Sequence, residues 1–298
     1  MKHLLKLEGM PSAAMEEILA STEAIKAKRG GGEAKPLNSQ TWAMIFTKSS
    51  TRTRVSFEVG IRELGGSVMF LNANDMQLGR GEPIKDTARV LGRMVHGAVI
   101  RTFAQADVEE FAEYSGIPTI NALTDDEHPC QILTDIFTFQ EQRGPIRGKV
   151  VTYVGDGACN VPVSWVHAAA ALDFELRIAA PSEFQPNAEI LAKAGGNIFC
   201  TEDIRAGVEG ADMVYTDVWV SMGMEADASE RLAKLADYQI NGKLMRLAKP
   251  DALVMHCLPA YRGKEIDAET FEAHSDTIFT QAENRLHTQK AILAWLVS

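Results

Sequence analysis

Short apolar segments alternate with amphipathic segments along the whole chain, and most of the apolar segments lack a polar face. In the first half these segments are TWAMIF, SVMFLNA, GAVIRTF and PTINAL; in the second half they are VVTYVG, LRIAA, NIFC, DMVYTDV and ALVMHCLP. Strands that are apolar on both faces are typical of a parallel sheet buried between helices. The alternation of strand and helix therefore predicts an α/β fold with open parallel sheets and right-handed crossovers.

A turn-rich break, EQRGPIRGK over residues 141–149, follows a long amphipathic stretch near the middle of the chain. The length of 298 residues is typical of about two domains. We therefore expect two α/β domains, each a parallel β-sheet flanked by helices, over residues 1–143 and 144–283. The last segment, residues 284–298, has a helical pattern, and we assign it to the first domain on the interpretation that it packs back across the boundary.

Composition and charge narrow the class of protein. The chain carries 30 Lys and Arg against 40 Asp and Glu, a net charge of −10, so general nucleic-acid binding is not expected. No run approaches the roughly 18 apolar residues of a membrane span, and the first residues do not resemble a signal peptide, so a cytoplasmic protein is expected. The cysteines, Cys130, Cys159, Cys200 and Cys257, lack metal-ligand spacing, which argues against structural zinc and a disulfide framework.

The densest polar motif is K-S-S-T-R-T-R, from Lys48 to Arg54. It lies between a predicted strand and a predicted helix, so it covers the strand-to-helix turn and the first turn of that helix. A helix N-terminus offers N–H groups and partial positive charge, and the hydroxyls and guanidinium groups add to them. The motif therefore predicts a site for a phosphate or a similar anion, although it is no Walker P-loop. The alternative is that Ser49 or Ser50 merely caps the helix while the cations face solvent.

Two more groups of polar residues follow strands in the first half. Arg101 ends an otherwise apolar strand, where a cation requires a carboxylate or a ligand as its partner. His128 and Gln131 open the helix that begins at Pro129. The alternative is that the acidic residues 125–127 cap this helix and that the histidine is incidental. Next to an anion site, an imidazole suits a carbonyl or leaving oxygen.

The second half offers two loops after strands. In VVTYVGDGACN the pattern G-x-G-x-x-G is incomplete, because Asn160 stands where the third glycine belongs. This departure argues against NAD binding and makes Asn160 a candidate ligand contact. In DVWVSMGME, Asp217 and Ser221 could hold a cationic amino group, or the segment could be only a surface loop.

ALVMHCLP ends a strand with His256 and Cys257. Neighbours on an extended segment point to opposite faces, so His256 is badly placed to activate the thiol. A hydrolase of the cysteine–histidine type is therefore not expected, and Cys257 alone is compatible with a small buried side chain.

These motifs, in this order, resemble the carbamoyltransferase family. Its marks are S-T-R-T-R at 50–54, H-P-C-Q at 128–131 and H-C-L-P at 256–259, and the resemblance covers nearly the whole chain. S-M-G at 221–223 together with H-C-L-P is similar to the ornithine-specific members. The resemblance implies transfer of the carbamoyl group from carbamoyl phosphate to the δ-amine of L-ornithine, giving L-citrulline and phosphate in arginine metabolism.

The resemblance also implies site residues, one by one. Those for carbamoyl phosphate are Ser50, Thr51, Arg52, Thr53, Gln77, Arg101, His128, Gln131 and Arg285. Those for L-ornithine are Asn160, Asp217, Ser221, Met222, Cys257 and Leu258, and the catalytic groups are Arg101, His128, Cys257 and Arg52. No metal and no organic cofactor is implied, and the assembly is a homo-oligomer, a trimer. The family's G-D-x-x-N-N run reads G-D-G-A-C-N in this chain.

The mechanism follows as a hypothesis from these roles. Arg101 and His128 would stabilise the oxyanion on the carbamoyl group, and Arg52 the departing phosphate. Asp217 would hold the α-amino group, while Cys257 would orient the δ-amine without becoming a covalent nucleophile. The alternatives are a sister enzyme that uses putrescine or another amine, an NAD(P)-dependent oxidoreductase, and a catalytically idle regulatory homologue.

Overall fold

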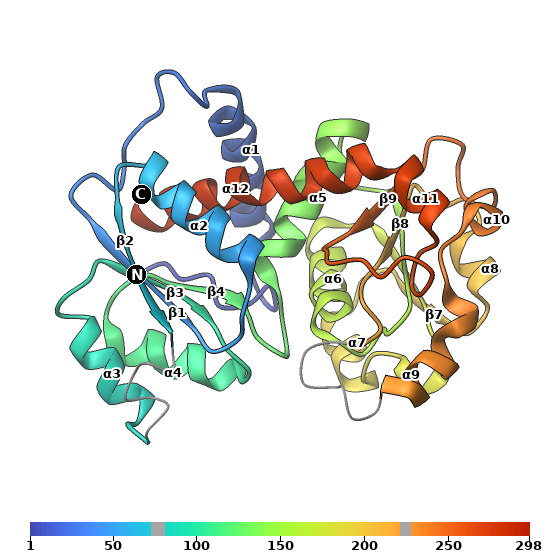
Figure 1. Cartoon of the computed structure of the whole chain (residues 1–298), viewed down its shortest axis with the longest axis horizontal. Helices are drawn as coiled ribbons and strands as arrows, with labels where there is room; N and C mark the ends of the chain where they lie inside the picture. Colours follow the sequence, from blue (N-terminus) through green and yellow to red (C-terminus); the bar gives the residue numbers. More distant parts are fainter. Residues whose placement is uncertain (73–80, 221–227) are drawn as a thin grey trace. The chain divides into compact units, whose positions relative to one another are not determined.

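The computed structural model of the chain describes residues 1–72, 81–220 and 228–298. Its contacts separate into two compact units (Figure 1). Unit 1 consists of residues 1–137 and 284–298, and unit 2 of residues 138–283. Each unit has its own parallel sheet with helices around it, which confirms the predicted fold class.

Unit 1 is built on a sheet with the strand order β2-β1-β3-β4, in which all neighbouring strands are parallel. Its strands are β1 (Thr41–Phe46), β2 (Ser67–Asn72), β3 (Gly97–Arg101) and β4 (Thr119–Leu123). Its helices are α1 (Ser12–Ala27), α2 (Thr51–Glu63), α3 (Ile84–Leu91), α4 (Gln105–Ser115), the first part of α5 (Pro129–Arg143) and the last part of α12 (Ser275–Val297).

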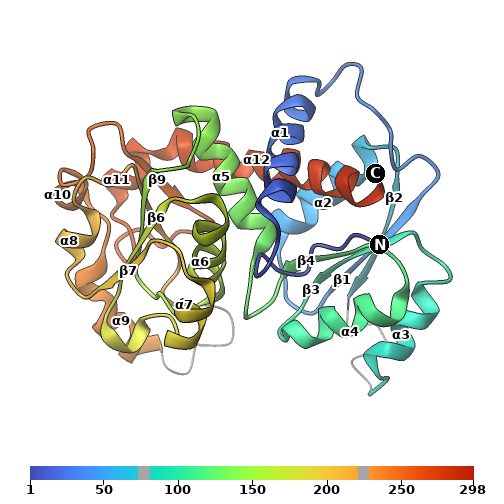
Figure 2. The same cartoon turned by 180° about the vertical axis from the view of Figure 1, so that it is seen from behind.

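The two faces of the unit 1 sheet are covered by different helices (Figures 1 and 2). Alternate residues of β1 and β3 pack with α3 and α4 into one buried cluster, which includes Ala43, Ile45, Ala88, Ala98, Ile100, Val108 and Phe111. On β3, a Cβ at Gly97 would lie 2.5 Å from the ring of Trp42, so this strand start has room only for glycine. The period of two along each strand thus sets which helix each side chain meets.

The C-terminal part of α12 packs on the first unit, in agreement with the interpretation that residues 284–298 pack back on the first domain. A Cβ at Gly60 of α2 would lie 3.2 Å from Cγ of Lys290, so the two helices are in close contact there. The Lys290 ammonium is fully buried and bonds to Glu33 at 2.5 Å and to Glu63 at 2.7 Å. Two carboxylates thus neutralise the buried cation. No helix in the described part of the chain, α12 included, is long and apolar enough to cross a membrane.

Unit 2 is built on a sheet with the order β7-β6-β5-β8-β9, again with parallel neighbours. Its strands are β5 (Val150–Val154), β6 (Glu175–Ala179), β7 (Ile198–Thr201), β8 (Met213–Thr216) and β9 (Leu253–His256). Its helices are α6 (Asn160–Leu172), α7 (Ala188–Ala194), α8 (Ile204–Val208), α9 (Ala228–Leu235), α10 (Gly242–Met245) and α11 (Ala268–Ala273), with short 3-10 helices at Ser182–Phe184 and Ala236–Tyr238.

Aromatic packing centres the unit 2 core on α6 and the middle strands. The Trp165 ring meets Phe174 edge-on at 5.9 Å and Tyr215 at 5.7 Å, and Tyr215 stacks on Tyr153 at 6.0 Å between ring centroids. Because α6 is apolar nearly all round, it is buried along its length, as such helices are.

Each sheet has a point where the strand order reverses. In unit 1 this point lies between β1 and β3, and in unit 2 it lies between β5 and β8. Open parallel sheets bind ligands at the carboxyl ends of the strands beside such a point. The loops after these four strands are therefore the expected ligand-binding positions in each unit.

Candidate functional site

The loop after β1 leads into α2 through Ser50, which is the N-cap of that helix. The Ser50 Oγ accepts a hydrogen bond from the backbone N–H of Thr53 at 3.3 Å. Thr51 and Arg52, in the first turn, are exposed. The capping interpretation of Ser50 is therefore correct, and it coexists with exposed donors at a helix N-terminus, where an anion is favoured.

Lys48, in the same motif, does not face solvent, although the alternative interpretation placed the cations of this motif in solvent. Its side chain is buried, forms an ion pair with Asp125, and lies 4.2 Å from the centroid of the Phe103 ring. The backbone N–H of Thr47 also donates to the carbonyl of Arg101 at 2.9 Å. These contacts tie together the loops that follow β1, β3 and β4.

Three distant segments of unit 1 meet at Arg285 of α12. Its guanidinium donates to Oε1 of Gln131 and, at 3.2 Å, to Oγ1 of Thr53. Gln131 in turn donates through Nε2 to Asp135 at 2.7 Å. Arg285, Gln131 and Thr53 are all buried, so this arrangement is held rigidly at the first turns of α2 and α5.

His128, which immediately precedes α5, lies among the cations of this unit. Burial lowers the pKa of its imidazole well below the ordinary value, and the nearby charges of Arg285 and Arg101 lower it further. The ring is therefore neutral near pH 7. We call Thr53, Arg101, His128, Gln131 and Arg285 the unit 1 site. It combines two buried guanidinium groups with neutral hydrogen-bonding groups, a combination suited to an anion that also carries a carbonyl.

In unit 2, Asp217 follows β8 at the point of strand-order reversal. Its Oδ1 accepts the backbone N–H of Val218 at 2.7 Å. Burial raises the pKa of its carboxyl, while His256 and a hydrogen bond with the Cys257 thiol act in the opposite direction. A buried carboxylate of this kind favours a cationic partner.

His256 uses both ring nitrogens within unit 2. Its Nδ1 accepts the backbone N–H of Leu258 at 2.9 Å, so the ring proton lies on Nε2, which faces Oε1 of Glu265 at 3.2 Å. His256 therefore orders the loop after β9 and does not activate Cys257. Asp217, His256 and Cys257 have potential metal-ligand atoms within 4.8 Å of one another, but the histidine could bind a metal only by giving up one of these bonds.

The loop after β9 also contains Leu258, whose backbone has φ of +60°. A leucine in this left-handed region costs of order 1–3 kcal/mol, and such residues cluster at functional sites.

Asn160 is the first residue of α6, next to the loop after β5. Gln77, Ser221 and Met222 lie outside the described residues.

Two cysteines that lie in the sequence motifs have thiols that are not nucleophilic. Burial raises the pKa of Cys130, in H-P-C-Q, to about 12, and its Sγ bonds to the carbonyl of Asn121 at 3.4 Å. Burial, together with the charges of Asp156 and Asp217, raises the pKa of Cys159 well above its ordinary value. Both therefore stay protonated thiols rather than nucleophilic thiolates.

Sequence reasoning missed a contact that orders unit 2. Arg231 of α9 forms an ion pair with Asp156 in the loop after β5, and its Nε donates to the carbonyl of Trp219 at 2.9 Å. We call these three residues the Arg231 clasp. The partners are separated by 75 residues in the chain, so no local pattern could have signalled the pair.

The comparisons with known proteins agree across the chain. A family model described as the aspartate/ornithine carbamoyltransferase carbamoyl-P binding domain matches residues 2–141. A model described as the Asp/Orn binding domain of the same family matches residues 147–296. A curated protein of Akkermansia muciniphila named ornithine carbamoyltransferase is 52% identical over 299 residues, covering 99% of this chain and 98% of the relative. One of Pseudomonas aeruginosa, named as anabolic, is 47% identical and covers 99% of this chain and 97% of the relative.

Solved structures give the same result. The ornithine carbamoyltransferase from Pyrococcus furiosus matches with a TM-score of 0.92 and 43% identity, covering 99% of this chain and 97% of the other. The anabolic enzyme from Campylobacter jejuni matches with a TM-score of 0.94 and 41% identity, covering 99% of both chains. The chain therefore belongs to the aspartate/ornithine carbamoyltransferase family.

Proposed function

We propose that the chain transfers the carbamoyl group of carbamoyl phosphate to the δ-amine of L-ornithine, giving L-citrulline and phosphate. The observation that carries this proposal is the meeting of Thr53, Gln131 and Arg285 beside His128 and Arg101 within unit 1. Relatives that share about half of this sequence are named for the same reaction. Family membership argues against the oxidoreductase alternative, and arginine metabolism is the proposed context.

For carbamoyl phosphate, we propose that the start of α2 holds the phosphate and that the unit 1 site holds the rest. Ser50, Thr51 and Arg52 lie at a helix N-terminus, where N–H groups and the helix dipole favour an anion. The buried guanidinium groups of Arg101 and Arg285 favour the remaining negative charge. Gln77 is kept as a further proposed contact.

For L-ornithine, we propose that Asp217 holds the α-ammonium. Burial raises the pKa of this carboxyl, and the ligand's ammonium would supply the opposite charge that a buried carboxylate favours. The Cys257 thiol, which is hydrogen-bonded to Asp217, would orient the δ-amine. The further proposed contacts are Asn160, Ser221, Met222 and Leu258.

The reaction requires the site to stabilise negative charge first on the carbonyl oxygen and then on the departing phosphate. The neutral δ-amine attacks the carbamoyl carbon, and negative charge grows first on the carbonyl oxygen. Arg101 and the neutral imidazole of His128 would stabilise that oxygen, each donor contributing roughly 3 kcal/mol when preorganised. Arg52 and the α2 N-terminus would stabilise the phosphate as it leaves. The δ-amine, with an ordinary pKa near that of lysine at about 10.4, must lose its proton before it attacks.

We further propose a homotrimer in the cytoplasm. The trimer is what the family resemblance implies, and sedimentation equilibrium should give three times the mass of one chain. A reducing compartment suits the four cysteines, all of which are free thiols in the structure.

Citrulline formation from carbamoyl phosphate tests the function, with ornithine, putrescine, N-acetylornithine and aspartate supplied in parallel. A strong preference for ornithine is the expected result. Turnover with a different amine would overturn the acceptor assignment while leaving carbamoyl transfer in place. Absence of turnover with all four would contradict the proposed reaction.

A further inference from the structure

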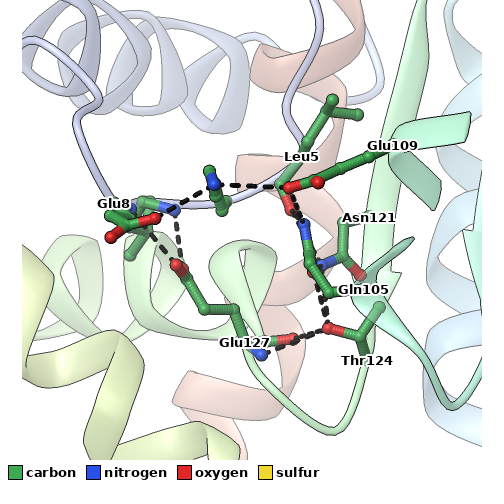
Figure 3. A network of polar contacts seen from close by, with 9 residues as sticks. Leu5, Glu8, Gln105, Glu109, Asn121, Thr124 and Glu127 are labelled. Carbon is green, nitrogen blue, oxygen red and sulfur yellow. Dashed lines mark hydrogen bonds and ion pairs between the residues drawn. The ribbon is translucent and has the colours of Figure 1, made fainter. Parts of the chain in front are cut away.

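The loop that presents His128 is tied to the N-terminal segment of the chain, and the proposed function does not use this connection. Glu127, the residue before His128, is only 3% exposed. Its Oε2 accepts the backbone N–H of Leu7 at 2.6 Å, and its Oε1 accepts that of Glu8 at 3.2 Å (Figure 3). One buried carboxylate thus holds two consecutive backbone donors that lie about 120 positions earlier in the chain.

The same loop is closed by its own backbone. The N–H of Thr124 donates to the carbonyl of Glu127 at 2.9 Å, and the N–H of Glu127 donates to Oγ1 of Thr124 at 3.2 Å. The His128 carbonyl then accepts the N–H groups of Gln131 and Ile132, which begin α5. The backbone on both sides of His128 is therefore fixed, on one side by Glu127 and on the other by the helix.

The N-terminal segment is itself held on the sheet. Leu4 bridges to Ile120 of β4, and its carbonyl accepts the N–H of Asn121 at 2.7 Å. The Nδ2 of Asn121 and the Nε2 of Gln105 both donate to the carbonyl of Leu5, at 2.9 and 3.1 Å (Figure 3). The segment is thus a fixed anchor to which a side chain of the His128 loop can be tied.

Burial of the Glu127 carboxylate has an energetic cost, which the pKa of this group reflects. Burial raises the pKa of the Glu127 carboxyl to about 7, while the N–H groups of Leu7 and Glu8 oppose this rise. Of the charged groups nearby, the carboxylate of Glu8 raises this pKa and the ammonium of Lys6 lowers it. Lys6 itself bridges Glu8 at 3.0 Å and Glu109 of α4 at 3.3 Å.

We propose that Glu127 is a positioning residue for carbamoyl transfer: by binding the N–H groups of Leu7 and Glu8, it sets the place of the His128 imidazole. This inference rests on the proposed role of His128. A displacement of about 1 Å at a reacting group can cost up to 100-fold in rate, so loss of the tether should be visible in kinetics.

Steady-state kinetics of three Glu127 variants test the proposal. Glu127→Ala is expected to lower kcat/KM for carbamoyl phosphate between about 10-fold and 100-fold, while the KM for ornithine stays within about twofold. Glu127→Asp, one methylene shorter, should behave like the alanine variant. Glu127→Gln keeps the length and one acceptor for Leu7, so it should retain most of the activity, and it serves if the alanine variant fails to fold.

Lys6→Ala is the matched control, because it removes the surface ion pairs with Glu8 and Glu109 but leaves the hydrogen bonds from the Leu7 and Glu8 N–H groups to Glu127; it should match the wild type. The inference is overturned if Glu127→Ala and Glu127→Asp keep wild-type kcat/KM, or if Lys6→Ala causes an equal loss. His128→Ala, measured in parallel, separates the two proposals. Wild-type kinetics there would remove the role of His128 and this inference with it. A large loss in His128→Ala beside unchanged Glu127 variants would overturn the positioning role alone.

Discussion

At the scale of single residues, environment decides which members of the motifs can do chemistry. His128 is kept neutral by burial and by two neighbouring guanidinium groups, so it can stabilise an oxygen without adding charge. Cys130, two positions further, is kept protonated by burial and bonds to the carbonyl of Asn121. In K-S-S-T-R-T-R, Lys48 is paired with Asp125, whereas Arg52 is exposed at the helix start. The same motif therefore contains a structural cation, Lys48, and an exposed cation, Arg52, for which we propose ligand binding.

Arg52→Ala should raise the KM for carbamoyl phosphate by about tenfold to a hundredfold, because a hydrogen bond to a charged group is worth roughly 1.5–3 kcal/mol. Arg54→Ala is the matched control. Its guanidinium lies 3.7 Å from the centroid of the Phe70 ring, so it should leave the KM near the wild-type value. Wild-type kinetics for Arg52→Ala would show that the phosphate binds elsewhere.

The raised pKa of Glu127 makes a prediction about stability. Because the folded protein holds this proton up to about pH 7, while the unfolded chain releases it near its ordinary value of 4.5, the contribution of Glu127 is largest below pH 4.5 and is lost as pH rises to 7. Melting temperatures of the wild type and Glu127→Gln should be recorded from pH 4.5 to 8. The melting temperature of the wild type should fall relative to that of the variant as pH rises. A difference that stays constant with pH would contradict a raised pKa.

At the scale of elements, both sheets have candidate residues in the loops after the strands that flank the reversal of strand order, and further candidates follow the outer strands β4 and β9. In unit 2 the loops after β5 and β8 are joined by the Arg231 clasp, in which one guanidinium reaches a carboxylate and a carbonyl. Asp217 lies two residues before Trp219, so the clasp also restrains the proposed ornithine contact.

Arg231→Lys should raise the KM for ornithine about tenfold and leave that for carbamoyl phosphate unchanged, since an ammonium lacks the planar fork that reaches both partners. Lys234→Ala, on the same helix, removes only surface ion pairs with Glu183 and Glu230 and should be neutral. An unchanged KM for ornithine in Arg231→Lys would show that the clasp has no part in substrate binding.

The contact between α3 and α4 depends on one glycine. A Cβ at Gly92 would lie 1.8 Å from the carbonyl oxygen of Ser115, and a backbone atom cannot swing aside. Gly92→Ala should therefore cost about 3 kcal/mol or more of unfolding free energy, measured by chemical denaturation. Gly31→Ala is the control, because no atom lies within 4 Å of its Cβ position. Equal stability of the two variants would contradict the packing described for Gly92.

At the scale of the whole molecule, the hydrophobic pattern predicts the fold class, although not the order of the strands in each sheet. Every segment expected to be a strand overlaps one, and TWAMIF coincides with β1. The errors lie at strand ends: DMVYTDV and ALVMHCLP were expected to continue, but β8 ends at Thr216 and β9 at His256. The loops that follow are partly buried, so their apolar residues look like further strand, although the backbone has already turned.

The site could be predicted where its residues are local in sequence. The N-terminus of α2 and the start of α5 follow from turn and cap signals, whereas Arg285 came only from the family resemblance. The sequence indicates Glu127 only as a possible cap for α5, because nothing in the pattern of the first residues shows that Leu4 bridges to β4. Contacts between segments more than 100 positions apart leave no periodic trace in the sequence.

Both substrate sites are proposals that one structure can test: carbamoyl phosphate at the start of α2, and ornithine at Asp217. A crystal structure with a bisubstrate analogue, in which a phosphonoacetyl group is joined to the δ-nitrogen of ornithine, tests both halves at once. We expect the phosphonate on Ser50, Thr51 and Arg52, and the α-ammonium on the Asp217 carboxylate. A phosphonate bound away from α2, or an α-ammonium that does not contact Asp217, would contradict the proposed binding of the substrates.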